Sequence, residues 1–179
     1  FDSGKDYETY LRDTVNRAAE KSAALVYRFP PIPLVVEPLA AFQQGKGVPA
    51  HYMAGTAQRP GRFVFDPMSY ARVNKATAEI LAAHEGYPGH HLQISITQAG
   101  GGFHPLSNLL SYSGYTEGWA RYAEALAEEQ GIYQTDAARI IRRAWPARGM
   151  VLDTGLHILG WSDEELVAFL DASGQKDFT

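Results

Sequence analysis

The sequence predicts a mainly helical α+β fold with a small antiparallel β-sheet, and three observations support this prediction. Apolar residues recur at helical spacing near the N-terminus and again from residue 74 onward. Between these regions, short apolar runs are separated by turn-rich sequence, which is typical of strands. The chain has 179 residues, of which 45% are hydrophobic, so it can bury the core of one domain. We therefore treat residues 1–179 as a single segment.

The first 70 residues are expected to form one helix and three extended segments. The helix is predicted within residues 6–29, and it ends where prolines follow, because proline lacks a backbone donor. The short apolar run 34–40 is predicted to be extended. Two strands are predicted around residues 51–54 and 62–65, joined by the turn-rich sequence GTAQRPG, and one of them is expected at the edge of the sheet.

The remainder of the chain is expected to be helical. Asn74 is suited to cap the helix that follows it, and Gly131 is suited to end a helix over residues 114–131. A long helix is predicted over residues 135–160, with a bend at Pro146 and Gly149. Another begins at Ser162, where Glu165 completes a capping box. The predicted apolar stripe of the helix over 114–131 consists of Trp119, Tyr122, Ala123, Leu126 and Ala127.

The composition excludes several classes of protein. The net charge of −4 gives no reason to expect nucleic acid or an anionic membrane as a partner. There is no cysteine, which removes disulfides, thiolate catalysis and cysteine-ligated zinc. The longest apolar runs fall short of the ~20 residues that a membrane span needs. No signal peptide is visible and the chain does not begin with Met, so we expect a fragment or a processed form.

The stretch HEGYPGHHLQ, residues 84–93, holds the strongest chemical signal. It begins like H-E-x-x-H, in which two histidines four positions apart bind zinc from one face of a helix. Here Pro88 occupies the place of the second histidine. On a regular helix, His90 lies roughly 240° around and about 9 Å along from His84, and His91 lies about 10.5 Å along. Neither pair can hold one ion on an unbroken helix.

The sequence itself supplies a break in that helix. The ring of Pro88 would clash with the carbonyl group of His84, four residues back, and Gly89 tolerates backbone angles that other residues resist. We therefore predict a bulge over residues 87–89. If two residues loop out, His90 takes the place that a histidine four positions after His84 would have, whereas His91 would need three. The alternative is that these are polar residues on a turn with no metal.

Glu85 and one glutamate of the helix over 114–131 would complete a zinc site. Glu85 follows the first histidine, where a general base could reach a metal-activated water. A catalytic zinc usually has three protein ligands and one open position, so a third ligand must come from elsewhere. We rank Glu117 first, because it lies near the start of its helix beside apolar residues, and Glu124 second.

Three segments together resemble the DUF885 family of bacterial proteins, which is grouped with the gluzincin metallopeptidases. They are HEGYPGHHLQ, YTEGWARYAE and VLDTGLHILGWS, and they occur in the family's order between about residues 48 and 161. The resemblance implies a helical gluzincin-like catalytic domain that binds Zn²⁺ through His84, His90 and Glu117, with Glu85 as the base. Family members are several hundred residues long and often exported. The resemblance therefore also implies an incomplete domain that associates with missing parts of a larger protein, in the periplasm or cell envelope.

Further site residues are expected with less specific roles. His91 is expected to contact a metal ligand or the substrate. Asp153 could orient an imidazole ligand, and His157 could stabilise an oxyanion or bind a substrate carboxylate. Tyr87 and Tyr115 are candidates to assist the oxyanion. Ordinary helix packing is the alternative for these side chains.

The expected function is zinc-dependent hydrolysis of peptide bonds, with Glu85 passing a proton from water to the leaving amine. An edge strand near residues 62–65 could pair with an extended peptide substrate. The competing hypothesis is a non-catalytic zinc-binding or peptide-binding module whose zinc site is closed, for example by both His90 and His91. A third is an inactive truncated relative that binds partners through its groove.

Overall fold

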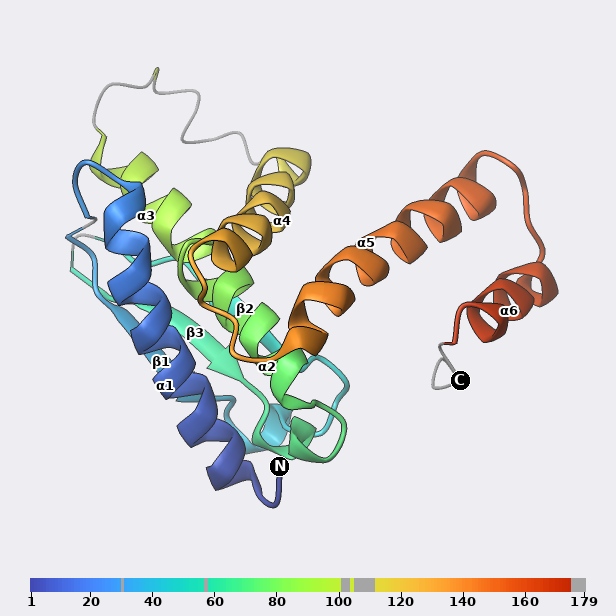
Figure 1. The fold of residues 1–179 in the computed structure, drawn as a ribbon, viewed down its shortest axis with the longest axis horizontal. Coiled ribbons are helices and arrows are strands. Elements are labelled where there is room, and N and C mark those ends of the chain that lie inside the picture. The colour runs from blue at the N-terminus through green and yellow to red at the C-terminus, as the bar shows by residue number, and fades with distance from the viewer. Residues whose placement is uncertain (30, 57, 101–103, 105–111, 175–179) are drawn as a thin grey trace. The chain divides into compact units, whose positions relative to one another are not determined.

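The computed structural model describes residues 1–29, 31–56, 58–100, 104 and 112–174. The chain divides into two compact units, Phe1–Ala138 and Arg139–Thr179. Figure 1 shows the helices and the small sheet of the first unit, and the helices of the second. The predicted α+β class is confirmed. Among the described residues, no helix is long and apolar enough to cross a membrane.

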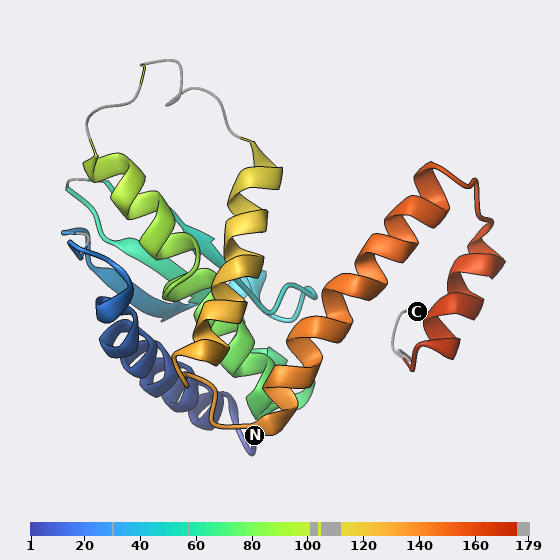
Figure 2. The same cartoon turned by 45° about the horizontal axis from the view of Figure 1, so that its top comes forward.

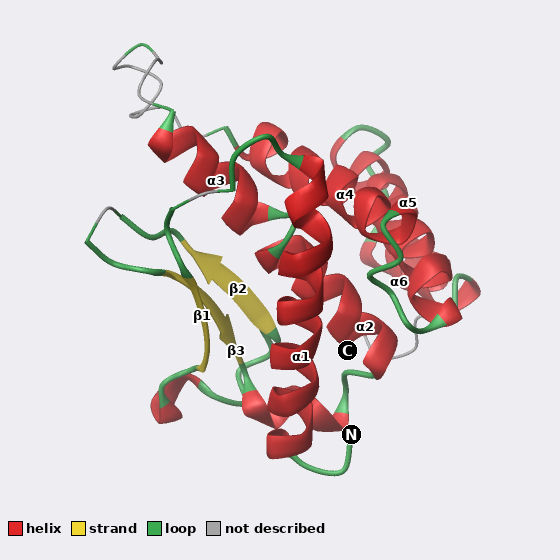
Figure 3. Cartoon of the chain, turned by 60° about the vertical axis from the view of Figure 1, so that its left-hand side comes forward, coloured by secondary structure: helices red, strands yellow, loops and turns green. Residues whose placement is uncertain are grey.

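The first unit begins with helix α1, Gly4–Ser22, in which Ser3 caps the N-terminus by accepting a hydrogen bond from the Asp6 backbone. A short 3₁₀ turn, Ala23–Leu25, follows. The helical run therefore ends before the prolines, whereas the sequence predicted a helix that reaches toward residue 29. The buried face of α1 packs against the sheet, where the ring of Tyr7 meets that of Phe65 edge to face at 5.7 Å between centroids. Figure 3 shows α1 beside the three strands.

The sheet consists of β1 (Leu34–Pro38), β2 (Ala50–Met53) and β3 (Gly61–Phe65), in the spatial order β1-β3-β2. β2 and β3 are antiparallel, as expected of a hairpin. β1 pairs with β3 in parallel, from Leu34 opposite Gly61 to Pro38 opposite Phe65, so the sheet is mixed. The prediction that residues 62–65 form an edge strand is wrong. β3 is central and buried at Phe63, Val64 and Phe65, whereas β2 is an edge strand.

Besides the short 3₁₀ segments Ala41–Gln43 and Pro67–Ala71, the first unit contains the helical segments that lead to the site. They are α2 (Lys75–Leu81), a π-helical segment (Ala82–Gly86), α3 (His90–Ala99) and α4 (Ser113–Glu129). Asn74 caps α2 through the Thr77 backbone, and Gly131 ends the α4 region with a φ of +63°, both as predicted. α4 packs against the π segment and against α3, which run beside it in Figure 2. The core is formed by side chains of α1, β3 and α2, including Tyr7, Leu11, Val15, Phe63, Phe65, Ala78 and Ile80.

The buried face of α4 differs from the predicted stripe. The structure buries Ala120, Ala123, Glu124 and Ala127, whereas Tyr122 is exposed and Trp119 and Leu126 are half-buried. The three small alanines allow α4 to approach the π segment closely. The same face therefore buries a carboxylate, that of Glu124, which a polarity pattern would assign to solvent.

The second unit contains most of helix α5 (Asp136–His157) and helix α6 (Asp163–Ala172). α5 continues through Pro146, which lies inside the helix. Ser162 and Glu165 form the predicted capping box. The ring of Trp161 lies so close to Gly155 that a Cβ atom there would be 2.4 Å from it, which explains a glycine at this position.

Candidate metal centre

The helix that contains His84 is interrupted where the sequence predicts a break. α2 widens into the π segment at Ala82–Gly86, Tyr87 takes extended backbone angles, and α3 begins at His90. Gly89 is required here because a Cβ atom would lie 1.9 Å from the carbonyl oxygen of His84. The indole Nε1 of Trp119 donates a hydrogen bond to the Pro88 carbonyl at 3.0 Å, so α4 holds the break from outside. The backbone therefore leaves the helix over three residues, 87–89, one more than the two that the sequence argument assumed, and the histidines on either side of this break converge.

His84, His90 and Glu117 form one cluster whose nearest ligand atoms all lie within 4.8 Å of one another. The two imidazole rings meet edge to face with centroids 4.7 Å apart. His84 Nε2 lies 3.3 Å from Glu117 Oε2, and His90 Nε2 lies 3.4 Å from Glu117 Oε1. Both histidines are buried, whereas the Glu117 side chain is 58% exposed. In the described part of the chain, no other group of three such side chains comes as close together.

The distances from Glu117 to the two histidines are longer than direct hydrogen bonds between charged groups. Ligand atoms that bind zinc at about 2.0–2.1 Å in a tetrahedron lie roughly 3.3–3.4 Å from one another. A hydrogen bond between a charged imidazole and a carboxylate is shorter, about 2.7–2.9 Å. The separations of 3.3 and 3.4 Å between Glu117 and the two Nε2 atoms are near the first value, and they involve different carboxylate oxygens, Oε2 toward His84 and Oε1 toward His90. Two imidazoles and one carboxylate are also a donor set typical of zinc with one position left open.

Glu124 and Arg121 of α4 support His84 from the side away from Glu117. The buried Glu124 carboxylate lies 2.8 Å from His84 Nδ1 and accepts a 2.7 Å hydrogen bond from Arg121. Because Nδ1 faces a carboxylate, it is expected to carry the ring proton, which leaves the Nε2 lone pair free toward Glu117. Glu124, ranked second as a ligand, therefore contacts the outer nitrogen of His84 and is not in the cluster.

His91 points away from the cluster. Its Nε2 lies 3.1 Å from the Ile32 carbonyl oxygen, and its Nδ1 lies 3.0 Å from the Tyr52 hydroxyl. Both ring nitrogens thus have partners in the protein. Burial lowers the pKa of His91 to about 4, which keeps the ring neutral. His90, with its Nε2 in the cluster, is the histidine that pairs with His84.

Glu85 is buried beside the cluster. Burial raises its pKa, the positive field of His84 and hydrogen bonding from the Tyr52 backbone lower it, and the negative charge of Glu117 raises it. The carboxylate therefore feels both His84 and Glu117 while belonging to the same π segment as His84. Desolvation also lowers the pKa of His90. Deprotonated imidazole is the form that binds a metal.

The other predicted site residues are placed as follows. Tyr87 is buried, with its ring 4.9 Å from that of His91 and stacked at 5.1 Å on that of Phe29, and burial raises its pKa to about 12. Tyr115 is exposed in the first turn of α4. Asp153 and His157 belong to the second unit, where they are exposed and 3.8 Å apart. The catalytic roles expected of these four residues stay predictions.

Three contacts of the site have no clear signal in the sequence. Glu124 is one of several acidic residues on α4, and helical periodicity does not distinguish it from the others. The hydrogen bond of Trp119 to Pro88 depends on how two helices meet. Tyr52, on strand β2, carries the hydroxyl that His91 contacts, yet its strand gives no indication of a site. Each contact joins segments at least 30 residues apart, and local sequence patterns do not encode such pairings.

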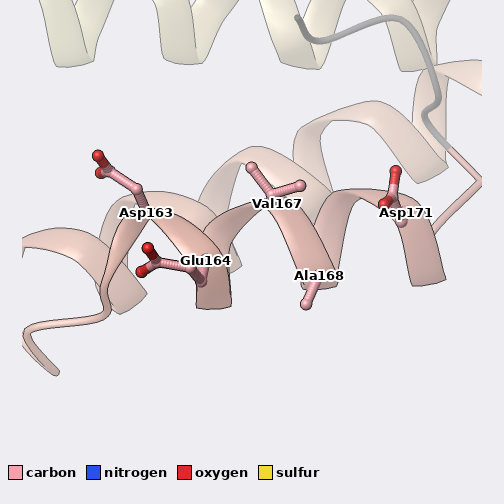
Figure 4. Close-up of a pocket in the computed structure, with 5 residues that line it drawn as sticks. All are labelled: Asp163, Glu164, Val167, Ala168 and Asp171. Carbon is pink, nitrogen blue, oxygen red and sulfur yellow. The ribbon is translucent and has the colours of Figure 1, made fainter.

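A shallow hollow in the second unit is lined by α6 and differs in chemistry from the cluster. Figure 4 shows its five lining residues, with the carboxylates of Asp163, Glu164 and Asp171 beside Val167 and Ala168. The lining contains no histidine. It is an exposed acidic helix face, of the kind that solvent covers in many proteins.

The fold and the cluster define an α+β protein with a His-His-Glu candidate metal centre on an interrupted helix. The chain belongs to the family described as "Bacterial protein of unknown function (DUF885)", whose sequence profile matches residues 2–177. Among solved structures it resembles one described as "the putative lipoprotein from Colwellia psychrerythraea", with 24% sequence identity and a TM-score of 0.85. The match covers 94% of this chain and 30% of that chain, so this chain spans less than a third of that protein's length. No curated protein matches the chain.

Proposed function

We propose that the protein is a zinc-dependent peptidase in which His84, His90 and Glu117 bind the metal. The observation that supports this most directly is the spacing of 3.3 and 3.4 Å between the Glu117 oxygens and the two Nε2 atoms. Zinc supplies Lewis acidity, which polarises a carbonyl group and lowers the pKa of water. Three protein donors leave one tetrahedral position for a substrate or water, as catalytic sites require.

The protein's own residues would hold and move the proton. Glu85 lies in the same π segment as His84, and its carboxylate is subject to the charges of His84 and Glu117, so we assign to it the role of accepting a proton from water. It would then return that proton to the leaving amine. Glu124, with Arg121 behind it, would keep His84 in the ring orientation that directs Nε2 into the cluster.

Of the two edge strands, β1 and β2, the edge of β2 lies beside the π segment, and we assign it to an extended peptide. β2 pairs with β3 on one side only, and it packs against the π segment that contains His84 and Glu85. An edge strand can take a further strand through backbone hydrogen bonds. We therefore assign the pairing with an extended peptide to β2, Ala50–Met53, in place of residues 62–65. A peptide paired there would lie beside the base.

A closed, non-catalytic zinc site would require a fourth protein ligand. His91 was the candidate, and both of its ring nitrogens contact other groups of the protein. This favours the catalytic alternative. We also propose a location in the cell envelope and association with further parts of a larger protein, because the Colwellia protein is described as a lipoprotein and is much longer than this chain.

The decisive experiment combines metal analysis of the purified chain with digestion of a mixed peptide library read by mass spectrometry. We expect one zinc per chain and cleavage products. Glu85→Gln should abolish cleavage while metal content stays unchanged, because this side chain does not bind the ion. His84→Ala and Glu117→Ala should lower metal content, whereas Glu129→Ala, at the exposed end of the same helix as Glu117, should not.

Three results would contradict the proposal. The wild-type chain could hold no zinc after exposure to it. Glu117→Ala could keep full zinc occupancy, which would place the third ligand elsewhere. Glu85→Gln could lose metal together with activity, which would make Glu85 a ligand and not the base.

A further inference from the structure

Tyr52 contacts three residues of the site from outside the metal cluster. Its hydroxyl lies 3.0 Å from His91 Nδ1. Its ring lies nearly parallel to that of His90, at an angle of 26° and with centroids 6.5 Å apart. Its backbone interacts with the Glu85 carboxylate. One residue of an edge strand thus bonds the histidine between α3 and the sheet, and it lies beside a candidate ligand and the candidate base.

The direction of the hydrogen bond at His91 follows from its partners. The Ile32 carbonyl oxygen can only accept, so the Nε2 that faces it at 3.1 Å must carry the proton. Nδ1 of the neutral ring is then an acceptor, and the Tyr52 hydroxyl donates to it. Ser95 contributes a weaker contact to the same nitrogen at 3.4 Å. His91 therefore fastens α3 to the segment before β1 and to β2 at once.

Gly61 of β3 leaves the room that this pair needs. A Cβ atom at position 61 would lie 2.6 Å from His91 Nδ1 and 2.6 Å from the Tyr52 hydroxyl oxygen. These contacts are too short for any side chain. The central strand β3 therefore needs a glycine where the Tyr52 hydroxyl meets the His91 imidazole. The bond between Tyr52 and His91 is thus built into the sheet as well as into α3.

We propose that Tyr52 is a positioning residue for the metal centre: its hydroxyl, bonded to His91, fixes edge strand β2 against α3 and so holds His90 and Glu85 in place. This inference rests on the proposed function. It explains why the buried His91, adjacent to a ligand, is not itself a ligand. His91 anchors the start of α3. Its hydrogen-bond partner Tyr52 lies on β2, the strand to which we assign the substrate.

The test uses Tyr52→Phe, which removes the hydroxyl and keeps the ring against His90. Zinc affinity is measured by competition with a chromogenic chelator, and the geometry of the site by the visible absorption of the Co²⁺-loaded chain. We expect the Kd for zinc to rise about tenfold, in line with the loss of other outer contacts of ligand histidines, and the Co²⁺ spectrum to change. On the peptide that the wild-type chain cleaves fastest, kcat should fall while KM stays within about threefold.

Tyr10→Phe is the matched control. The Tyr10 hydroxyl also makes a partly buried hydrogen bond, 2.7 Å to Glu79, but it contacts no residue of the metal centre. Tyr10→Phe should cost a similar loss of melting temperature and leave the zinc Kd and the Co²⁺ spectrum unchanged. A purely structural role for Tyr52 would make the two variants behave alike.

The outcomes separate this inference from the proposed function. If the wild-type chain binds no zinc, the proposed function fails and this inference fails with it. If the wild-type chain binds zinc and Tyr52→Phe matches it in Kd, spectrum and kcat, only the role of Tyr52 is overturned. The same holds if Tyr10→Phe weakens zinc binding equally. Should Tyr52→Phe not fold, Gly61→Ala decides, because its Cβ atom displaces the same pair and should also raise the zinc Kd.

Discussion

His84 is the residue on which most of the site geometry depends, because carboxylates of α4 face both of its ring nitrogens. Glu124 lies 2.8 Å from Nδ1, and Glu117 lies 3.3 Å from Nε2. These glutamates are two helical turns apart, so a single helix can hold the ring at both ends. The 2.8 Å contact is a hydrogen bond, whereas the 3.3 Å contact is longer than a hydrogen bond between charged groups and is near the separation expected if both side chains bound one ion.

Glu124→Gln tests the orienting role of the outer carboxylate. The amide keeps the shape of the side chain but removes the charge that favours a proton on Nδ1 and that Arg121 contacts at 2.7 Å. We expect zinc affinity to fall by about 10–100-fold with the chain still folded. Competition with a chelator measures the Kd. Glu129→Gln, on the same helix and exposed, should leave it unchanged, and equal affinities for all three proteins would exclude this role for Glu124.

Gly89→Ala tests the break in the helix. The added Cβ atom would meet the His84 carbonyl oxygen at 1.9 Å, so the backbone must separate there and draw the two histidines apart. We expect unfolding free energy to fall by at least about 2 kcal/mol and zinc binding to be lost. Urea unfolding and metal analysis measure the two effects.

Gly149→Ala is the control for that substitution. Gly149 lies inside α5 with open space where a Cβ atom would be, so alanine should stabilise the helix by about 0.5–1 kcal/mol. If Gly89→Ala instead behaves like Gly149→Ala and keeps its zinc, the close approach at residue 89 is not what brings His84 and His90 together.

At the scale of elements, Glu79 links three segments of the first unit. Its fully buried carboxylate accepts hydrogen bonds from the Tyr10 hydroxyl of α1 and from the backbone N–H groups of Gln134 and Thr135, just before α5. The Thr135 hydroxyl donates to it as well, at 2.8 Å. Glu79 belongs to α2, which leads directly into the π segment that contains His84. Its side chain therefore joins α2 to α1 and to the residues before α5.

Glu79→Gln should therefore destabilise the fold without changing the metal centre itself. An amide has only one acceptor oxygen for these donors, and its NH₂ group would face some of them. We expect a loss of about 1–3 kcal/mol in the free energy of unfolding, measured in urea, and an unchanged zinc Kd for the folded chain. Glu20→Gln, on the exposed side of α1, should stay within about 0.5 kcal/mol of the wild type. A similarly small effect at Glu79 would show that its hydrogen bonds are replaceable.

At the scale of elements, the ends of several helices could be predicted from the sequence, whereas the pairing of strands and helices could not. Asn74, Gly131 and Ser162 cap or end helices through contacts within a few residues, so their sequence context contains the needed information. The parallel pairing of β1 with β3 joins residues about 27 apart and has no local signature. It also moves residues 62–65 from the edge to the centre of the sheet. Likewise, the buried Glu124 has a partner in His84, 40 residues earlier, which the sequence around Glu124 does not indicate.

For the molecule as a whole, the part of the candidate site that could be predicted is the part that follows from the backbone restrictions of proline and glycine. Pro88 and Gly89 forbid a regular helix between His84 and His90, so their convergence could be argued from the sequence. The sequence argument preferred His90 over His91 by assuming that two residues loop out, whereas in the structure three residues, 87–89, lie between the π segment and α3. The supporting contacts from Tyr52, Trp119 and Arg121 could not be predicted, because they depend on how the sheet and α4 close around that segment.

Zinc should stabilise the folded chain as a whole, because the three ligands come together only in the folded state. A ligand present at 100 times its Kd adds about 2.7 kcal/mol to the free energy of unfolding. We expect the melting temperature to rise with added zinc and fall with chelator, and amide hydrogen exchange to slow in residues 82–93 and 113–124. His84→Ala should remove the response. A zinc-dependent melting temperature that persists in His84→Ala would place the stabilising ion at another position.

The unequal exposure of the three ligands has a kinetic consequence. The histidines lie within the protein, while the carboxylate of Glu117 reaches solvent with 58% of its side-chain surface. An incoming cation would meet the Glu117 carboxylate first and lose water ligands there before it reached the imidazoles. A departing cation would leave past the same carboxylate. Rates of capture and escape should consequently respond to changes at position 117 more than to changes at either imidazole.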